Sequence, residues 1–527
     1  MLPKITLIGL ALGVRWLLFF GGVRGADAYA YAHHAYNITV GQYTVTADTM
    51  SYGFRYTVLL PTALAYKLFG VGDWPSALFP LLASLATVWM VIRLGTLWLD
   101  KQTGLLGGLL YAVYPLDLPW ASLLGPDSYI PVLSAGAMLA FWLAGEETRP
   151  AWQRRGFYAV SGLCVGLAAQ ARETGLLLLP VLVMLAWSRR GRARIIGAIL
   201  AGSLTPLLLE LGYYWVTIGN PVHKISVLEK LNDLYVGGSA EGPTSLAYYP
   251  RAMFGMDLEG LAWFGLFAYA ALGALAIAAW TGEIPRLRPL LVWILPPLLY
   301  LEFGSLSVSQ YAPVSKSYPY LTIISVPVVL VCAYGLSRVR DFANDAGAGF
   351  RTAWRSATVA AIALLVLTSL YGSSRLLENF KDDARPFEAV AAAVQAHPER
   401  LIYVPHDRWP LLLNYHLRYR TGFNYYAQTP AGSARLKDIR ELERAATVEP
   451  AYVVLHDRYL FYDTAGRPVE RADVPDLVRH PPSSWRAVVQ ERAEPAYNSF
   501  TLYETEPASP RRVAVTGPVG EAGADTR

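Results

Sequence analysis

Up to about residue 371, the chain consists of apolar runs separated by polar or aromatic connections. Each run approaches the roughly 20 residues that an α-helix needs to cross the hydrocarbon core of a bilayer. About eleven runs can be distinguished on this criterion, at residues 5–23, 76–99, 104–118, 128–144, 156–169, 174–187, 195–216, 261–280, 290–303, 321–336 and 357–371. The pattern predicts an α-helical polytopic membrane protein.

After residue 371 the apolar residues occur in shorter groups that alternate with polar ones. The groups at 401–404, 451–455, 485–489 and 500–503 are typical of strands, and those at 386–396 and 434–446 of helices. We therefore predict a membrane domain over residues 1–372 and a small α/β domain over residues 373–507. Residues 508–527 are rich in Gly, Pro, Ala and charge without apolar periodicity, which predicts a disordered tail.

Composition supports the membrane class, because 54% of the residues are hydrophobic and only 16% are charged. The mean hydropathy is +0.30. The net charge of +5 gives no indication of a nucleic-acid partner. Both cysteines, Cys164 and Cys332, lie inside apolar runs, so the sequence predicts neither a disulfide framework nor a cysteine metal site.

Basic residues mark alternate connections between the predicted spans. These connections contain Arg93 and Lys101, Arg149 to Arg155, Arg189 to Arg194, Arg286 and Arg288, and Arg338 to Arg355. The positive-inside rule places them in the cytoplasm, together with the N-terminus. The long loops 24–74 and 217–260 then lie outside, and an odd number of spans places the C-terminal domain on the same extracytoplasmic side.

Two acidic residues are candidates for chemistry on the outer face. Asp27 lies just past the first apolar run, and Asp127 opens a later one on the same predicted side. A carboxylate within a bilayer costs about 3 kcal/mol at the centre of a helix and is tolerated mainly where a site needs it. Each residue could instead cap a helix. Two carboxylates on one face can serve as a base and a positioning group, so we predict both as catalytic residues.

Aromatic and basic residues on the same face are candidates for substrate binding. Tyr31 and His34 follow Asp27 at helical spacing, although both types also occur as ordinary interfacial residues. Arg55 and other outer cations could simply anchor lipid headgroups. Arg172 interrupts two short spans, where an ion pair with Glu173 is the structural alternative.

A further cation precedes a late span. Lys316 lies in the stretch Ser-Lys-Ser-Tyr-Pro-Tyr, which also contains Tyr318 and leads into the apolar run at 321–336. This position places Lys316 at the same outer membrane interface as the two acidic residues. We predict that Lys316 and Arg172 hold a phosphate, and that Tyr318 lies with them.

The order of these segments resembles that of a known superfamily. Residues 26–32 read Ala-Asp-Ala-Tyr-Ala-Tyr-Ala, and they are followed by the stretch 55–68 with its Pro61, by Pro126-Asp127, by the glycine-containing run that ends at Arg172, and by Lys316 to Pro319. This arrangement resembles the GT-C glycosyltransferases that use polyprenyl-phosphate sugars, particularly the protein O-mannosyltransferase and lipid A aminoarabinose transferase branch. Ala28 departs from the glutamate that is usual after the first acid, and Lys316 stands where arginine is commoner. The Trp-Trp-Asp-Tyr-Gly signature of oligosaccharyltransferases is absent.

The resemblance implies that one sugar moves from a polyprenyl-phosphate donor to an acceptor hydroxyl at the extracytoplasmic face of a bacterial inner membrane. In an inverting displacement, Asp27 would be the base and Asp127 an orienting group. Arg172, Lys316, Arg55, Tyr318, Tyr31 and His34 would bind substrate. The acceptor could be a lipid, a glycan or a protein. The sequence shows no clear metal-ligand cluster, so the need for a divalent cation stays open.

Two other classes of membrane protein share some of these features. A transporter or lipid flippase would also have many spans and intramembrane charges, but its charges are expected near the midplane rather than at one interface. A scaffold whose outer α/β domain binds a partner is the second alternative. The one-sided loops and charges favour the transferase.

Overall fold

The computed structural model describes residues 2–46, 49, 51–236, 247–256, 258–305, 311, 313–345, 348–405, 409–422, 435–442, 450–461, 468, 476–492 and 499–505. The chain forms two compact units, Met1–Ala384 and Arg385–Arg527. They divide inside a continuous helix, α16 (Ala348–Val394), later than residue 372, where the sequence suggested the boundary. The predicted tail at 508–527 lies outside the described residues.

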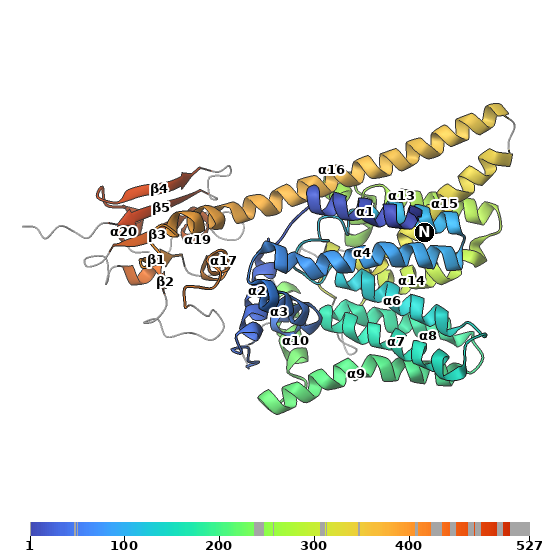
Figure 1. Ribbon diagram of the computed structural model, residues 1–527, viewed down its shortest axis with the longest axis horizontal. Coiled ribbons are helices and arrows are strands. Elements are labelled where there is room, and N and C mark those ends of the chain that lie inside the picture. Colours follow the sequence, from blue (N-terminus) through green and yellow to red (C-terminus); the bar gives the residue numbers. More distant parts are fainter. Residues whose placement is uncertain are drawn as a thin grey trace, which may run out of the picture. The chain divides into compact units, whose positions relative to one another are not determined.

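The first unit is built from helices (Figure 1). Its longer helices are α1 (Leu2–Leu17), α4 (Asp73–Trp98), α5 (Lys101–Ala112), α6 (Tyr129–Ala144), α7 (Ala151–Ala171), α8 (Leu178–Trp187), α9 (Arg192–Ile218), α13 (Phe267–Trp280), α14 (Ile284–Phe303), α15 (Ser325–Asp345) and α16. Shorter elements lie between them, namely α2 (Ala26–Thr39), η1 (Ser51–Phe54), α3 (Tyr56–Phe69), η2 (Glu173–Leu177), α10 (His223–Val236), α11 (Tyr248–Phe254), α12 (Leu258–Trp263) and η3 (Tyr318–Ile324).

Several of these helices have the composition of membrane spans. Among the described residues, five stretches are long and apolar enough to cross a bilayer: Asp73–Trp98, Arg192–Ile218, Ile284–Phe303, Tyr318–Phe342 and Thr352–Val394. Three shorter apolar helices are Tyr129–Ala144, Glu173–Trp187 and Phe267–Trp280. The multi-pass membrane class is therefore confirmed.

Several predicted spans have different bounds from those expected. The run 5–23 is helical only as far as Leu17, and the run 261–280 is divided between α12 and α13. The run 104–118 was expected to form one helix, but α5 ends at Ala112. Pro115 explains the early end, because a proline lacks the backbone donor that a helix interior needs and restricts the residue before it. The segment that follows is therefore free to turn toward the outer end of α6.

Glycines let α7 and α9 pack with their backbones in close approach. A Cβ atom added at Gly162 would lie 1.9 Å from the carbonyl oxygen of Ile199, and one at Gly202 would lie 2.0 Å from that of Ala159. Packing of this kind is common between membrane helices, because small residues maximise van der Waals contact where the hydrophobic effect is weak.

A buried polar network joins α1 to α4 and to the segment after α5. Arg15 Nε donates to Ser84 Oγ at 2.7 Å, and Arg15 Nη2 donates to Asp117 Oδ2 at 2.5 Å. The Ser84 hydroxyl also donates to Asp117 Oδ2 at 2.5 Å, and Arg15 Nη1 donates to the carbonyl of Ala112 at 2.7 Å. The charge of Arg15 within an apolar helix is thereby balanced.

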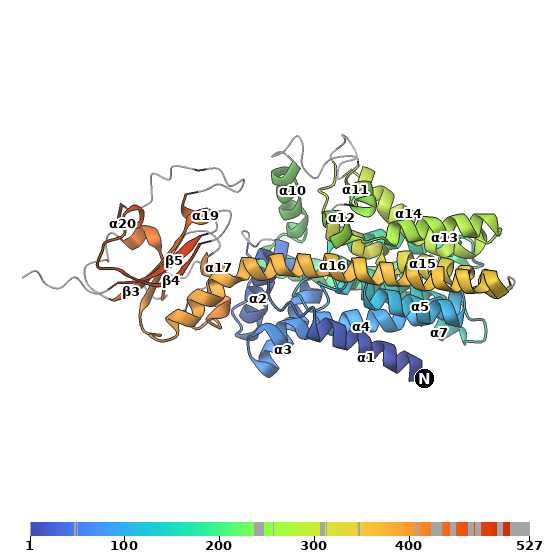
Figure 2. The same ribbon diagram turned by 90° about the horizontal axis from the view of Figure 1, so that it is seen from above.

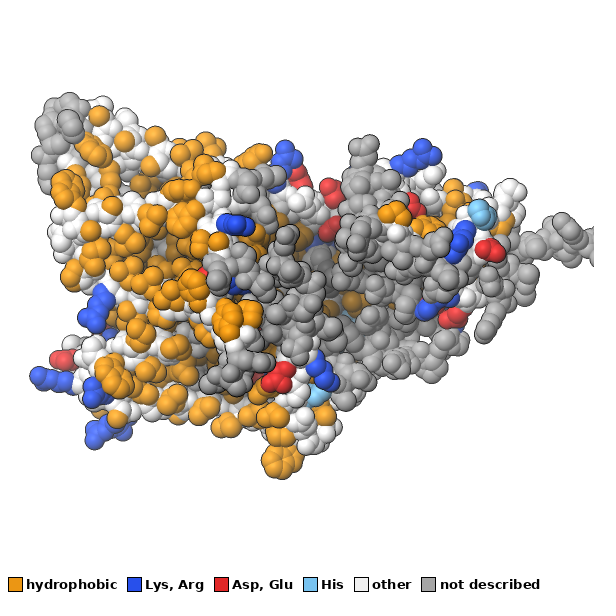
Figure 3. Space-filling view, turned by 180° about the vertical axis from the view of Figure 1, so that it is seen from behind, with side chains coloured by type: hydrophobic (Ala, Val, Ile, Leu, Met, Phe, Trp, Pro, Cys, Tyr) orange, Lys and Arg blue, Asp and Glu red, His pale blue; other side chains and the backbone are white. Residues whose placement is uncertain are grey.

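The surface of the first unit agrees with a lipid-facing role. Hydrophobic side chains dominate the face shown in Figure 3, and Lys and Arg gather toward one end of the unit. On α9, Leu209 is 71% exposed and Val216 is 85% exposed. Two of the predicted cytoplasmic connections lie together, because Arg286 Nη2 donates to the carbonyl of Leu99 at 2.7 Å.

The second unit contains a five-stranded mixed sheet in the order β2-β1-β3-β5-β4. The strands are β1 (Leu401–Val404), β2 (Leu436–Asp438), β3 (Ala451–His456), β4 (Arg486–Glu491) and β5 (Phe500–Thr505). Strand β1 pairs in parallel with β2 and β3, and β5 is antiparallel to β3 and β4. The helical elements are α17 (Trp409–His416), η4 (Ile439–Glu441), α19 (Asp457–Leu460) and α20 (Asp476–Arg479).

The helix predicted at 434–446 is wrong over its described part. Residues Leu436–Asp438 form the edge strand β2, and only the short helix η4 follows. Asp438 ends the strand, because its side chain accepts a hydrogen bond from the backbone N–H of Arg440 and so caps η4. Residues 443–449 lie outside the described part of the chain.

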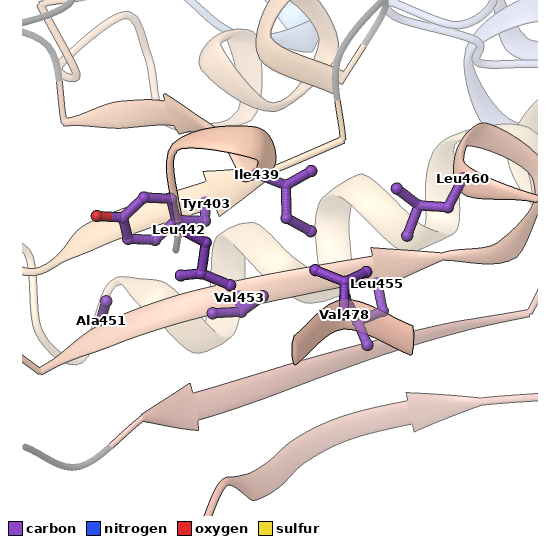
Figure 4. Close-up of a cluster of buried hydrophobic side chains, with 8 residues drawn as sticks. All are labelled: Tyr403, Ile439, Leu442, Ala451, Val453, Leu455, Leu460 and Val478. Atoms are coloured by element: carbon purple, nitrogen blue, oxygen red, sulfur yellow. The ribbon is translucent and has the colours of Figure 1, made fainter. Parts of the chain in front are cut away.

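Buried apolar side chains cover one region of this sheet (Figure 4). They come from the strands and from the short helices beside them, and they are Tyr403, Ile439, Leu442, Ala451, Val453, Leu455, Leu460 and Val478. The second unit thus has a hydrophobic core of its own, as expected of a domain.

Candidate functional site

Backbone hydrogen bonds hold the segment after α1 against the segment that precedes α6. The N–H of Gly22 donates to the carbonyl of Ser122 at 2.8 Å, and the N–H of Leu124 donates to the carbonyl of Gly22 at 2.9 Å. Gly22 and Leu123 form a parallel bridge. Asp27 and Asp127 follow shortly after this bridge, so their backbones start from neighbouring points.

Gly22 is required at this junction. Its φ angle is +73°, and an added Cβ atom would lie 2.6 Å from Asp73 Cγ. Residues other than glycine rarely adopt this backbone conformation, and a side chain at position 22 would collide with Asp73. Asp73 Oδ1 in turn accepts a hydrogen bond from the N–H of Val23 at 3.2 Å, which fixes the chain as it leaves α1.

Asp27 lies in the first turn of α2 and is exposed. A negative charge is favoured there by the helix dipole. Asp27 Oδ1 accepts a hydrogen bond from the Tyr52 hydroxyl at 2.9 Å. Tyr31 lies one turn further along α2, where it is buried and accepts a hydrogen bond from Arg55 Nη1. The Arg55 guanidinium also lies 5.5 Å from the Tyr31 ring and 5.9 Å from the Tyr52 ring.

Asp127 pairs with Arg172 rather than standing free at its helix end. Arg172 Nη1 donates to Asp127 Oδ1 at 2.6 Å, and Nη2 donates to Oδ2 at 3.5 Å. The side chains are 9% and 6% exposed. Helix α7 ends at Ala171, and Arg172 takes an extended conformation that turns it away from the helix. The Arg172 guanidinium lies 5.2 Å from the Tyr320 ring.

The two acids and two arginines all act electrostatically on the hydroxyl of Tyr31, and Arg55 donates a hydrogen bond to it. Burial raises the pKa of Tyr31 most strongly, while Arg55 and Arg172 act to lower it and Asp27 and Asp127 act to raise it. Burial by itself would lower the pKa of Arg55, but the neighbouring Tyr31, Glu173 and Asp27 raise it overall. The four charged residues therefore share one electrostatic environment, and Arg55 stays charged at neutral pH.

Lys316 belongs to a neighbouring buried cluster. Its Nζ lies 2.9 Å from Glu302 Oε1, and the N–H of Tyr249 donates to Glu302 Oε2 at 3.0 Å. Both charged side chains are buried. The charge of Lys316 is therefore already balanced by a protein carboxylate, a partner that the sequence did not indicate.

Tyr318 lies two residues further along, among aromatic rings. Its ring stacks on that of Tyr248 with the centroids 4.7 Å apart, and the ring of Trp263 lies 5.1 Å away. The same short segment continues to Tyr320, which contacts Arg172. Tyr318 therefore lies beside the charged site, in contact with aromatic rings.

His34 is buried on α2 and differs in character from the arginines. Burial, with a contribution from His33, lowers the pKa of His34 to about 3. His34 is therefore neutral at physiological pH and does not supply positive charge to a phosphate. Its assignment to substrate binding stays a prediction.

The described residues offer few metal ligands. Within that part of the chain, no group of three or more His, Cys, Asp or Glu side chains is placed to hold a metal ion. The charged site instead consists of alternating carboxylates and guanidinium groups. Such an arrangement suits an anionic ligand that can displace one carboxylate from an arginine.

Four residues that interact with the site were not predicted as site residues from the sequence: Tyr52, Glu173, Lys224 and Tyr320. Glu173 was considered only as an ion-pair partner of Arg172, and the observed partner of Arg172 is Asp127. Lys224 was one outer cation among many. The remaining signal, tyrosines in an outer loop, is common at membrane interfaces and does not single out Tyr52 or Tyr320.

Comparisons with known proteins show which family and which solved structures this chain is similar to. Residues 58–215 match the family described as dolichyl-phosphate-mannose-protein mannosyltransferase. The fold is similar to that of ArnT from Cupriavidus metallidurans in the apo state, with a TM-score of 0.61 and 15% identity over 95% of this chain and 97% of that one. The chain thus has the fold of the GT-C glycosyltransferases.

Further structures show the same GT-C glycosyltransferase fold. The structure of C. metallidurans ArnT bound to undecaprenyl phosphate matches with a TM-score of 0.62 and 14% identity, over 96% of this chain and 98% of that one. The apo oligosaccharyltransferase of Archaeoglobus fulgidus matches with a TM-score of 0.54 and 12% identity, over 93% and 79%. No curated protein gives a significant sequence match. The predicted resemblance to this superfamily is thus confirmed, while the matched family region contains Asp127 and Arg172 but not Asp27 or Arg55.

Proposed function

We propose that this glycosyltransferase moves one sugar from a polyprenyl-phosphate donor to an acceptor hydroxyl. The observation that carries the proposal is that Asp27, Asp127, Arg55 and Arg172 all act electrostatically on the hydroxyl of Tyr31, which accepts a hydrogen bond from Arg55. A lipid monophosphate donor is supported by the similar fold of the C. metallidurans ArnT structure, which contains undecaprenyl phosphate. The acceptor is a hydroxyl of a lipid, glycan or protein.

The site faces the extracytoplasmic side in this proposal. Helices α2, α3 and α10 gather at one end of the first unit, and the connections between α6 and α7 and between α8 and α9 lie at the other (Figures 1 and 2). The latter connections are rich in arginine, so the positive-inside rule makes them cytoplasmic. About eleven crossings of a bacterial inner membrane then place the second unit outside. A lipid donor can reach this interface while its isoprenoid chain stays in the bilayer.

Asp27 is the proposed base. It is exposed, and within the described part of the chain its one hydrogen bond comes from Tyr52 to Oδ1, so Oδ2 is available to a substrate hydroxyl. As Asp27 takes the proton, the acceptor oxygen bonds to the anomeric carbon and the bond from that carbon to the phosphate oxygen breaks. The displacement inverts the anomeric configuration.

Arg55 and Arg172 are the proposed holders of the donor phosphate. Negative charge grows on that phosphate as it leaves, and fixed guanidinium groups stabilise it in a shielded site. Asp127 acts by orienting Arg172, to which it is bound through both carboxylate oxygens. Lys316, Tyr318, Tyr31 and His34 are proposed to bind substrate as well, with Lys316 held in place by its ion pair with Glu302.

Sugar transfer in detergent tests the proposal. Purified protein is incubated with undecaprenyl-phosphate sugars, and release of undecaprenyl phosphate is followed together with the anomeric configuration of the product. Asp27→Asn should lower kcat by about 100-fold to 10,000-fold, the usual contribution of a general base. Glu146→Gln, in the arginine-rich connection at the opposite end, is the control and should retain activity. Full transfer by Asp27→Asn, or retention of configuration, would contradict the mechanism.

A further inference from the structure

A lysine on the outer helix α10 links this site to a second set of charges. Lys224 Nζ lies 3.2 Å from Glu210 Oε1 and 3.7 Å from Glu173 Oε1. The Lys224 side chain is 13% exposed and that of Glu210 is 4% exposed. One ammonium group is therefore shared between two carboxylates in a place largely shielded from water.

Glu210 holds Lys224 firmly in this position. Glu210 lies on α9 and accepts a hydrogen bond from the Tyr214 hydroxyl at 2.6 Å. The Tyr214 ring packs against Phe54 at 5.4 Å, and Phe54 also contacts His223, the neighbour of Lys224, at 5.6 Å. The first turn of α10 is thus fixed by packing against η1 and α9.

Glu173 is held more loosely than Glu210. Its side chain is 33% exposed, and its Oε1 atom is buried without a hydrogen bond among the described residues. The residue lies directly after Arg172 at the start of η2, and its charge acts on Arg55 as well as on Lys224. Glu173 therefore pairs with Lys224 and also acts electrostatically on Arg55, the arginine proposed to hold phosphate.

We propose that Glu173 is a positioning residue that competes with lipid phosphate for Arg55, and that Lys224 limits this competition by pairing with Glu173. The inference rests on the proposed function, because it assigns Arg55 to the phosphate. A carboxylate and a phosphate cannot both be fully bound by one guanidinium, so the net charge around Arg55 sets how tightly the phosphate is held.

In this proposal, Glu173 and Lys224 have opposite effects on the affinity for the lipid phosphate. Removing the charge of Glu173 leaves Arg55 more available and adds net positive charge near the phosphate. Removing the charge of Lys224 leaves Glu173 unbalanced, so that its carboxylate acts more strongly on Arg55. A pair that served only to hold the structure together would weaken binding in the same direction when either member was changed.

Binding of undecaprenyl phosphate to the full-length protein in detergent measures these effects. Glu173→Gln should lower the Kd by about three-fold to ten-fold, and Lys224→Met should raise it by a similar factor. Glu229→Gln is the matched control, because it removes one negative charge from an exposed position on α10, the helix that carries Lys224. Its Kd should stay within about two-fold of the wild type, since an exposed charge is screened by salt. Undecaprenol lacks the phosphate, so its binding should be equal in all four proteins.

Turnover gives a second measurement. Tighter retention of the lipid phosphate product should lower kcat of Glu173→Gln under saturating substrate, while a pre-steady-state burst reports an intact chemical step. If Glu173→Gln does not fold, Lys224→Met still tests the predicted rise in Kd, and Glu173→Asp should retain wild-type affinity.

The outcomes separate two failures. If the wild type binds undecaprenol as tightly as undecaprenyl phosphate, the proposed function is wrong. If the wild type prefers the phosphate but Glu173→Gln and Lys224→Met shift the Kd in the same direction, or leave it unchanged, the role of the pair is wrong and the proposed function stands.

Discussion

Arg15 and Asp117 form an ion pair in the interior of the first unit, with Nη2 2.5 Å from Oδ2 and side-chain exposures of 0% and 1%. The pair joins the first helix to the segment that leads toward Asp127. Removal of one partner leaves a buried charge without compensation, which typically costs about 3 to 5 kcal/mol. Its contribution to the site is indirect, since neither residue belongs to the charged group around Tyr31.

We predict that Asp117→Leu and Arg15→Met each lower the thermal unfolding temperature in detergent, and that the double variant is more stable than either. Apolar residues of similar volume can replace a buried ion pair at little cost, whereas a lone charge cannot be accommodated. Thermal unfolding of the four proteins gives the coupling between the two sites. Additive losses would show that the two charges do not stabilise each other.

A second prediction concerns Asp127 and Arg172. Asp127→Asn should lower both stability and donor affinity, because Arg172 loses its charged partner and the orientation that this partner imposes. Asp27→Asn should instead reduce turnover with little change in stability, because Asp27 is exposed. Unfolding temperature and the Kd for undecaprenyl phosphate, measured on both variants, distinguish the two roles. Identical profiles would contradict the division of labour between the acids.

The contact between α7 and α9 gives a third prediction, with controls on the same helices. Gly162→Ala should destabilise the protein by about 1 to 3 kcal/mol, the usual cost of overpacking, because the new Cβ would collide with the carbonyl of Ile199. Gly156→Ala and Gly197→Ala meet nothing within 4 Å. They should be neutral or stabilising by up to about 1 kcal/mol, since alanine favours helix over glycine. Equal effects at all three positions would show that close packing is not the cause.

The second unit should lose stability as the pH falls below neutral. His456 is buried at the end of β3, and burial, with a contribution from Arg458, lowers its pKa from 6.5 to about 4. Below pH 6.5 the unfolded chain gains a proton that the folded unit does not take up until about pH 4. The free energy of unfolding therefore decreases through this window, by about 2 kcal/mol at pH 5.

Hydrogen–deuterium exchange of peptides from β3 tests this in the full-length protein. Protection factors, corrected for the intrinsic effect of pH on exchange, should fall between pH 7 and pH 5. His456→Phe keeps an aromatic ring between Trp409 and Phe500 but cannot be protonated. It should show a flatter dependence, and a fall as steep as that of the wild type would assign the effect to another group.

The helices of the first unit could be predicted from sequence because both lipid-facing and interior positions of a membrane helix are apolar. Their ends were harder to predict. Pro115 ends the expected span at 104–118 early, since apolar composition continues beyond the point where the backbone can remain helical. In the second unit, β2 was mistaken for a helix, because three residues give too little periodicity to separate the two states.

In the candidate site, too, some features could be predicted from the sequence and others could not. A shared side for Asp27, Asp127 and Arg172 could be predicted, because sidedness follows from counting spans and basic connections. The partners could not. Pairing of Asp127 with Arg172, and of Lys316 with Glu302, depends on which helix ends meet in space, and a single sequence carries no record of that. Lys316 was consequently expected to be freer than it is.

The bridge between Gly22 and Leu123 has a consequence for how this protein can change during evolution. Only a few residues separate Gly22 from Asp27 and Leu123 from Asp127. Backbone hydrogen bonds thus set the distance between Asp27 and Asp127. Many side-chain substitutions nearby should leave this distance unchanged. An insertion in either short stretch would move one acid by about 3.5 Å, so length, more than residue identity, is what selection must preserve at this point.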